Sequence, residues 1–177
     1  MPGEQMPQTH HGSDQQGRMT MSEFTHFDEK GNAYMVDVSD KDVTKRTATA
    51  QGSISVSREV MDAVLCKKVK KGDVFTVAQT AGIMGTKRTS DLIPMCHPIS
   101  LTNAEVRFDV DEEAGTITAY CTAATEGKTG VEMEALTGVS AALLTIYDMC
   151  KAIDRRMVLS DIHLVEKKGG KSGDFKY

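Results

Sequence analysis

The stretch LTNAEVRFDVDEEAGTITAYCTAAT, residues 101–125, decides the fold. Polar and apolar residues alternate in its two halves, which is typical of strands that bury one face. DEEAG, residues 111–115, separates the halves and has the composition of a turn. We therefore predict an antiparallel hairpin with strands at 101–110 and 116–125.

The sequence on either side of this hairpin predicts helices and further strands. EGKTG, residues 126–130, breaks the chain before a long helix, and Ser57 and Gly72 are start and stop signals for another. Strands are predicted at 34–39, 44–57 and 157–167, helices at 58–70, 74–87 and 135–153, and a flexible end at 169–177. The order β, β, α, α, β, β, α, β has no strict βαβ repetition. It predicts an α+β fold whose antiparallel or mixed sheet carries the helices on one face.

Length and composition indicate one globular domain, with 177 residues, 40% hydrophobic and 26% charged. No apolar run reaches the roughly 20 residues of a membrane helix, and the N-terminus lacks the apolar segment of a secretory signal. The four cysteines form no C-x-x-C pair, so we expect reduced thiols and a cytoplasmic protein. Residues 1–30 are rich in Gln, His and Gly, which predicts a disordered tail before a single domain at 31–177.

The charge pattern favours a small phosphorylated ligand. The net charge is −4, of which residues 1–32 hold −3, so the rest of the chain is near −1. Basic clusters nevertheless occur at 67–71, 87–88 and 167–171. A nearly neutral domain with local basic clusters and only 5% aromatic residues fits a phosphorylated small molecule better than a long nucleic acid.

The predicted helix at 135–153 has a narrow polar stripe on an otherwise apolar surface. The stripe consists of Thr137, Ser140, Thr145, Asp148 and Lys151. Asp148 and Lys151 are three residues apart and can pair. A solvated stripe normally holds longer polar side chains, so small hydroxyls with one acid and one base suggest a partly enclosed, wet cleft. A plain surface stripe remains the alternative.

Two acids precede this helix in the segment VEME, residues 131–134. If the segment is extended, Glu132 and Glu134 face the same way, about 7 Å apart. Carboxylates near a helix N-terminus are favoured by the helix dipole, which gives them a structural role. Alternatively, together with Asp148, they tune or exchange protons with lysines.

A rigid histidine lies in LIPMCHPISL, residues 92–101, where prolines at 94 and 98 fix the backbone around His97. Cys96 and His97 have no third and fourth ligand at zinc spacing, so we expect no metal site. A rigid imidazole suits binding or acid–base work, and a structural histidine is the alternative.

Two lysines are adjacent to glycines in the sequence. Lys71 precedes Gly72 at a predicted helix C-terminus, where a cation is favoured in any case. GGKSG, residues 169–173, is not a P-loop, because Val165 occupies the position of the first glycine and no helix follows. Its backbone amides and Lys171 could still wrap a phosphate.

Three segments resemble one known family. They are KGDVFTVAQTAGIMGTKRTSDLIPMCHP, KTGVEMEALTGVSAALLTIYDMCKA and EKKGGKSGDF, at 71–98, 128–152 and 166–175. Together they are similar to the cyclic pyranopterin monophosphate synthases of molybdenum-cofactor biosynthesis. The resemblance runs from about residue 35 to the end, and several long matching segments are far more specific than a short motif.

The resemblance implies a reaction, a fold and an assembly. The family converts 3′,8-cyclo-7,8-dihydro-GTP to cyclic pyranopterin monophosphate and releases pyrophosphate. The reaction is an acid–base and hydrolytic rearrangement without a redox cofactor, although Mg²⁺ could accompany the triphosphate. The family fold is ferredoxin-like, and the family forms homohexamers, as trimers of dimers, with the pocket at a subunit interface.

The resemblance also implies residue roles. Lys71 and Lys151 match the main catalytic groups, and Asp148 matches the acid–base residue. Residues that match the substrate pocket are Met95, Cys96, His97, Glu132, Met133 and Glu134; those that match polar positions around the guanine or phosphates are Asp37, Arg46, Lys87 and Lys171. A GTP-like ligand brings about four negative charges, so several cations must converge on it. Glu132, Glu134, Asp148 and Lys151 are then expected to form one wall of the cleft.

Two other functions stay open. A regulatory module that binds a nucleotide or pterin on the same fold would bind the ligand without turnover. A small nucleic-acid-binding domain would show an affinity that falls steeply with salt, and the charge and aromatic content argue against it.

Overall fold

The computed structural model describes residues 30 and 32–177. The tail predicted at 1–30 therefore lies outside the described residues, apart from Lys30. The chain divides into two compact units, Met1–Tyr34 and Met35–Tyr177. All the helices and strands described below belong to the second unit.

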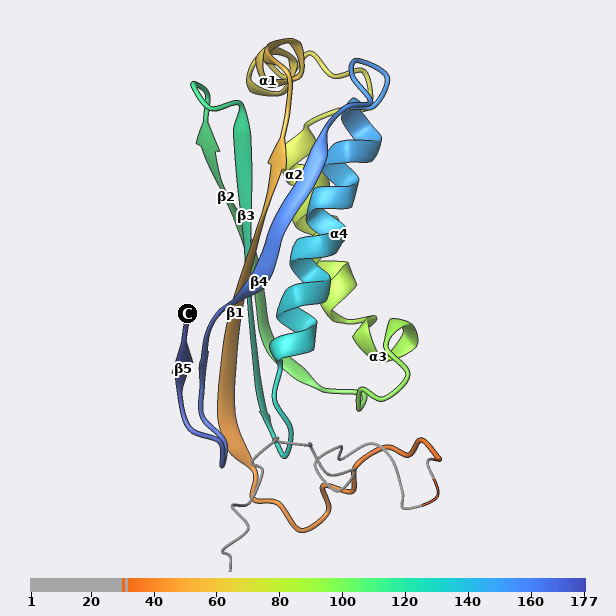
Figure 1. Ribbon diagram of the computed structural model, residues 1–177, viewed down its shortest axis with the longest axis vertical. Helices are drawn as coiled ribbons and strands as arrows, with labels where there is room; N and C mark the ends of the chain where they lie inside the picture. Colours follow the sequence, from red (N-terminus) through yellow and green to blue (C-terminus); the bar gives the residue numbers. More distant parts are fainter. Residues whose placement is uncertain (1–29, 31) are drawn as a thin grey trace, which may run out of the picture. The chain divides into compact units, whose positions relative to one another are not determined.

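The second unit contains a five-stranded sheet in which every neighbouring pair is antiparallel (Figure 1). The strands are β1 (Thr44–Ser55), β2 (Leu101–Asp111), β3 (Thr116–Gly127), β4 (Val158–Lys168) and β5 (Phe175–Lys176), and their order across the sheet is β2-β3-β1-β4-β5. The predicted hairpin is confirmed, with Asp111 opposite Thr116 where the turn closes. Strands β1 to β4 and the helices between them follow the β-α-β-β-α-β order of ferredoxin-like folds.

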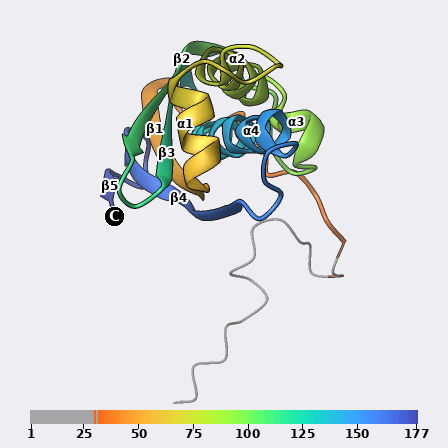
Figure 2. The same ribbon diagram turned by 90° about the horizontal axis from the view of Figure 1, so that it is seen from above.

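The helices lie on one face of this sheet, as predicted. They are α1 (Arg58–Leu65), α2 (Val74–Thr86), α3 (Thr89–Leu92) and α4 (Glu132–Cys150). Helix α4 packs on β1, β3 and β4, and α2 packs beside α4, as the view from above shows (Figure 2). The α+β prediction is therefore confirmed.

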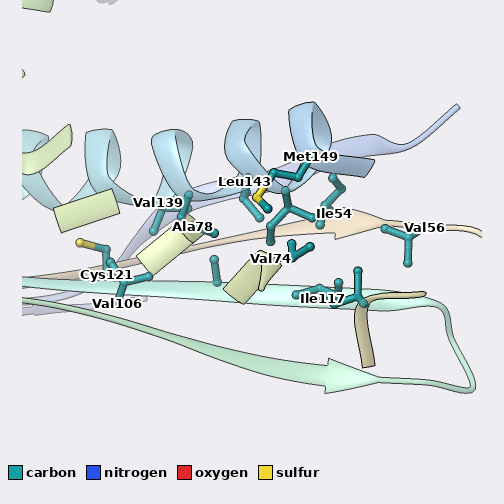
Figure 3. Close-up of a cluster of buried hydrophobic side chains, with 14 of the residues drawn as sticks. Ile54, Val56, Val74, Ala78, Val106, Ile117, Cys121, Val139, Leu143 and Met149 are labelled. Carbon is teal, nitrogen blue, oxygen red and sulfur yellow. The ribbon is translucent and has the colours of Figure 1, made fainter. Parts of the chain in front are cut away.

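The core lies between α4 and the sheet (Figure 3). Ile54 and Ile117 from the sheet and Val139 and Leu143 from α4 belong to this core, and all four are fully buried. Small sheet residues allow α4 to approach closely: a Cβ atom on Gly52 would lie 2.8 Å from Cγ1 of Val139. This close packing holds α4 in one position on the sheet. Functional groups at its two ends therefore have defined positions.

Two predicted elements differ from the structure: one predicted strand is not formed, and one helix is shorter than predicted. The segment at 34–39 is not a strand, because side chains of His97 and Lys128, rather than a neighbouring strand, contact its carbonyl groups. Helix α1 ends at Leu65 instead of residue 70, because Lys67 adopts a φ of 52°, which an α-helix does not contain. The Lys68 N–H then bonds to the Ala63 carbonyl and closes the helix end.

Helix α4 starts earlier than predicted, and two short elements were not predicted. VEME is not extended: α4 begins at Glu132, where acids complement the helix dipole. Helix α3 follows α2 almost directly. The end expected to be flexible contributes β5, which pairs with β4 through Lys176 and Glu166.

Candidate functional site

Two lysines and one aspartate meet at the C-terminal end of α4. Asp148 lies in the last turn and Lys151 caps the helix, while Lys71 comes from the loop between α1 and α2. Oδ2 of Asp148 lies 2.7 Å from Nζ of Lys71, and Oδ1 lies 2.7 Å from Nζ of Lys151. Lys71 also donates a hydrogen bond to the Asp148 backbone carbonyl at 2.9 Å. We call these three residues the lysine–aspartate cluster.

The charges of this cluster suit an anionic ligand. Lys151, followed by Lys71, lowers the pKa of the Asp148 carboxyl to about 2. The three side chains are about half-exposed, and ion pairs at such exposed sites contribute little to stability. The cluster therefore does little for the fold. It offers two ammonium groups around one carboxylate, with an excess positive charge open to a ligand.

A second group lies at the opposite end of α4, in its first turn. Glu134 is buried, with 3% of its surface exposed, and Met133 beside it is exposed. Burial raises the pKa of the Glu134 carboxyl, and the charge of Glu132 adds to this effect. Cys96 is close enough that, besides burial, the charge of Glu134 raises the pKa of its thiol. His97 follows, and its Nε2 lies 2.9 Å from the Val36 carbonyl oxygen.

The two ends of α4 are far apart. Fourteen residues separate Glu134 from Asp148, which corresponds to about 21 Å along the helix axis. Within a single chain, Glu132 and Glu134 therefore do not share a wall with Asp148 and Lys151, and a wall formed across a subunit interface stays a prediction. Glu132 and Glu134 also point differently, because residues two apart on a helix face away from each other: Glu132 is half-buried and Glu134 is fully buried.

Lys167 joins the group at the N-terminal end of α4; the sequence analysis placed it in a basic cluster but not among the candidate site residues. Its Nζ lies 3.5 Å from Oε1 of Glu132, and it also donates to the Ser172 hydroxyl. Only 18% of its side chain is exposed, and it lies opposite the buried Ala48 in the sheet. A lysine on the core-facing side of a strand is the signal that could have identified it.

Arg46 and Lys171 line one cavity of about 490 Å³ near the start of β1. The Arg46 Nε donates to the Gly127 carbonyl at 3.0 Å, which fixes the guanidinium at the end of the sheet. The other residues that line this cavity are Asp40, Lys41, Asp42, Thr44 and Gly170. Arg46 and Lys171, which were predicted separately, therefore share a second cationic pocket, in which the three cations Lys41, Arg46 and Lys171 exceed the two anions Asp40 and Asp42 by one charge.

The remaining predicted residues are placed separately. Asp37 accepts a hydrogen bond from the Ser39 N–H at 2.8 Å. Hydrogen bonding to the Ser39 side chain, followed by this backbone bond, lowers the pKa of its carboxyl. Lys87 caps α2 and is exposed, and Met95 is half-buried beside Cys96. Within residues 30 and 32–177, no three His, Cys, Asp or Glu side chains gather in a way that could hold a metal ion. Likewise, in that part of the chain no helix is both long and apolar enough to cross a membrane.

The fold and the site together define a class of protein. An α+β domain that carries cationic clusters, a buried carboxyl group and a rigid imidazole is suited to bind a polyanionic small molecule and to move protons on it. The chain belongs to the MoaC family, whose family model matches residues 35–170.

Curated relatives agree with this assignment. A cyclic pyranopterin monophosphate synthase of Clostridium perfringens strain SM101 is 55% identical over 156 residues, which cover 88% of this chain and 99% of the relative. Proteins of the same name from Heliobacterium modesticaldum and Clostridium acetobutylicum are each 57% identical, over 155 and 157 residues, and each alignment covers 88% of this chain and 98% of the relative. The resemblance inferred from the three sequence segments is confirmed.

Proposed function

We propose that this chain is a lyase that converts 3′,8-cyclo-7,8-dihydro-GTP to cyclic pyranopterin monophosphate with release of pyrophosphate. The observation that carries this proposal is the match of nearly full length to synthases of that name. The lysine–aspartate cluster supports it independently, because release of pyrophosphate builds negative charge that ammonium groups can neutralise.

The step that releases pyrophosphate gives each residue of the lysine–aspartate cluster a role. A substrate hydroxyl oxygen attacks the α-phosphorus, the bond from that phosphorus to the pyrophosphate oxygen breaks, and the hydroxyl proton passes to a base. We assign Lys71 and Lys151 to charge neutralisation and proton transfer, and Asp148 to acid–base work and to holding both lysines. The pocket residues at the other end of α4 bind the substrate; they are Met95, Cys96, His97, Glu132, Met133 and Glu134, with Asp37, Arg46, Lys87 and Lys171 around the guanine or phosphates.

Incubation of the purified chain with the cyclised GTP derivative tests the reaction. We expect one pyrophosphate per substrate consumed and a product with a cyclic phosphate, whereas GTP itself should release none. Binding of the derivative without release of pyrophosphate would favour the alternative, a regulatory module that binds nucleotides or pterins. The assay with no added cofactor tests our proposal that no redox cofactor is needed, and the same assay with and without EDTA tests our proposal that Mg²⁺ only accompanies the triphosphate.

We also propose that the active protein is a homohexamer arranged as a trimer of dimers, with each site shared between two chains. In one chain, the pocket residues and the lysine–aspartate cluster lie about 21 Å apart along α4. A compact site that contains both groups therefore requires the pocket residues of one chain and the cluster of another. Apolar side chains on the outer surface of α2 and α4 support such contacts: Val77, Met84 and Leu144 are 42%, 50% and 59% exposed. Light scattering should give close to six times the 19.2 kDa chain mass.

A mixing experiment tests the shared site. We expect the variants Lys71→Ala and His97→Ala, each inactive alone, to recover about a quarter of the wild-type rate when co-expressed, because one site in four then combines two intact halves. The matched control is a mixture of Lys71→Ala with Lys151→Ala, whose changes lie at the same end of α4 and should not complement. An active monomer, or no recovery in the first mixture, would contradict the shared site.

We place the protein in the cytoplasm. All four cysteines are free thiols, and Cys121 and Cys150 are buried. Reduced thiols are typical of proteins that work in the cytoplasm. Fractionation of the cells that produce the protein tests this placement.

A further inference from the structure

Residues 35–40 lie beside His97 without regular secondary structure, and we call them the strap. Val36 and Val38 are half-buried, while the residues between and around them are exposed. The strap is tied to the domain by two side chains. Nε2 of His97 lies 2.9 Å from the Val36 carbonyl oxygen, and Nζ of Lys128 donates to the Ser39 carbonyl.

The contact with Val36 determines which nitrogen of His97 carries a proton. A carbonyl oxygen only accepts hydrogen bonds, so Nε2 must be the donor. In the neutral ring, Nδ1 is then the nitrogen with the lone pair. A hydrogen bond from one ring nitrogen to a backbone carbonyl is a common way to fix the tautomer and orientation of a functional imidazole.

The strap also forms part of the wall of a cavity. Val38, His97, Thr125, Lys128 and Thr129 are among the residues that line this cavity of about 240 Å³. Thr125 is buried and donates its hydroxyl to the Ser100 carbonyl at 2.7 Å, which fixes the floor next to His97. The cavity is therefore built from the strap, the imidazole and the end of β3, and a displaced strap would open it.

We propose that the strap positions His97 for the substrate: the Val36 carbonyl holds the Nε2–H tautomer, Nδ1 is the acceptor that meets the ligand, and Lys128 secures the strap through Ser39. Val36 and Lys128 are thus positioning residues. The tautomer does not depend on the proposed function, whereas the use of Nδ1 in substrate binding rests on it.

Nuclear magnetic resonance of the full chain with ¹⁵N-labelled histidine tests the tautomer in the absence of ligand. The sequence has five histidines, and loss of one signal pair in His97→Asn assigns His97. We expect a slowly exchanging Nε2–H and an unprotonated Nδ1 in the neutral ring. Lys128→Met should accelerate exchange of the Nε2–H about tenfold, because the strap opens more often. Lys128→Arg and Lys45→Met, a matched loss of charge on β1, should leave it slow.

Two substitutions of His97 test which nitrogen meets the substrate. The amide oxygen of asparagine takes the place of Nδ1, whereas the amide of glutamine takes the place of Nε2. We expect KM to rise in both variants, and about tenfold further in His97→Gln than in His97→Asn, because only asparagine keeps an acceptor at the Nδ1 position. An unprotonated Nε2, an exchange rate indifferent to Lys128→Met, or the reverse order of KM values would overturn the proposal. Failure to release pyrophosphate in wild type would instead remove the proposed function and leave the tautomer result standing.

Discussion

Replacement of Lys71 or Lys151 by alanine is expected to lower kcat on the order of a thousandfold or more, while the chain still folds. Each lysine lies 2.7 Å from an oxygen of Asp148, so each substitution removes one of the two cations that face the ligand. In Lys71→Ala, the Asp148 backbone carbonyl also loses a charged donor. Because transition-state charge on the leaving pyrophosphate depends on such cations, the loss should appear mainly in kcat.

The matched control is Lys70→Ala, which removes the same charge one residue away from Lys71 on an exposed side chain. We expect the control to keep its turnover, and the thermal unfolding midpoints of all three variants to stay close to that of wild type, because exposed ion pairs contribute little stability. Turnover is measured as pyrophosphate release from the cyclised GTP derivative. Near-normal rates in Lys71→Ala or Lys151→Ala would refute their catalytic assignment.

The hairpin and the long helix could be predicted because their signals are local. Alternation along 101–125 and turn residues at 111–115 determine the strand pair, and the apolar surface around 135–150 determines the helix. The end of α1 could not be predicted, because lysine in a left-handed conformation has no compositional signal. Likewise, the segment 34–39 has the alternation of a strand, but the sheet offers it no neighbour.

The candidate site was predicted as a set of residues but not as an arrangement. The helix repeat places Asp148 and Lys151 side by side, and this pairing is found. The helix repeat does not predict which loop contacts which end of α4, because those contacts join residues far apart in the sequence. Lys71 reaches the C-terminal end from 77 residues away, and Cys96 reaches the N-terminal end. Lys167 was missed for the same reason, because its partner Glu132 lies on another element.

Asp148→Asn is expected to lower turnover on the order of a hundredfold and to change substrate affinity much less. The pKa of Asp148 is about 2, below the ordinary 3.8, because Lys151 and Lys71 favour the carboxylate. Because the pKa is lowered, the stabilising contribution of these contacts is fully present above pH 3.8 and is lost as the pH falls toward 2. At neutral pH, Asp148 in the ligand-free chain is thus an anion that holds two ammonium groups. The amide of asparagine keeps the shape and removes that charge.

The pH–rate profile separates the acid–base role of Asp148 from simple positioning. Because the amide of asparagine does not ionise, a limb of the profile that reflects ionisation of Asp148 should be absent in the variant. Substrate affinity should persist, because Arg46 and Lys171 in the other cationic pocket are unchanged. Single-turnover rate, substrate affinity and the profile are therefore measured together on Asp148→Asn and wild type. If the variant bound substrate poorly but kept the single-turnover rate and its pH dependence, Asp148 would only position the ligand, and its role in proton transfer would be wrong.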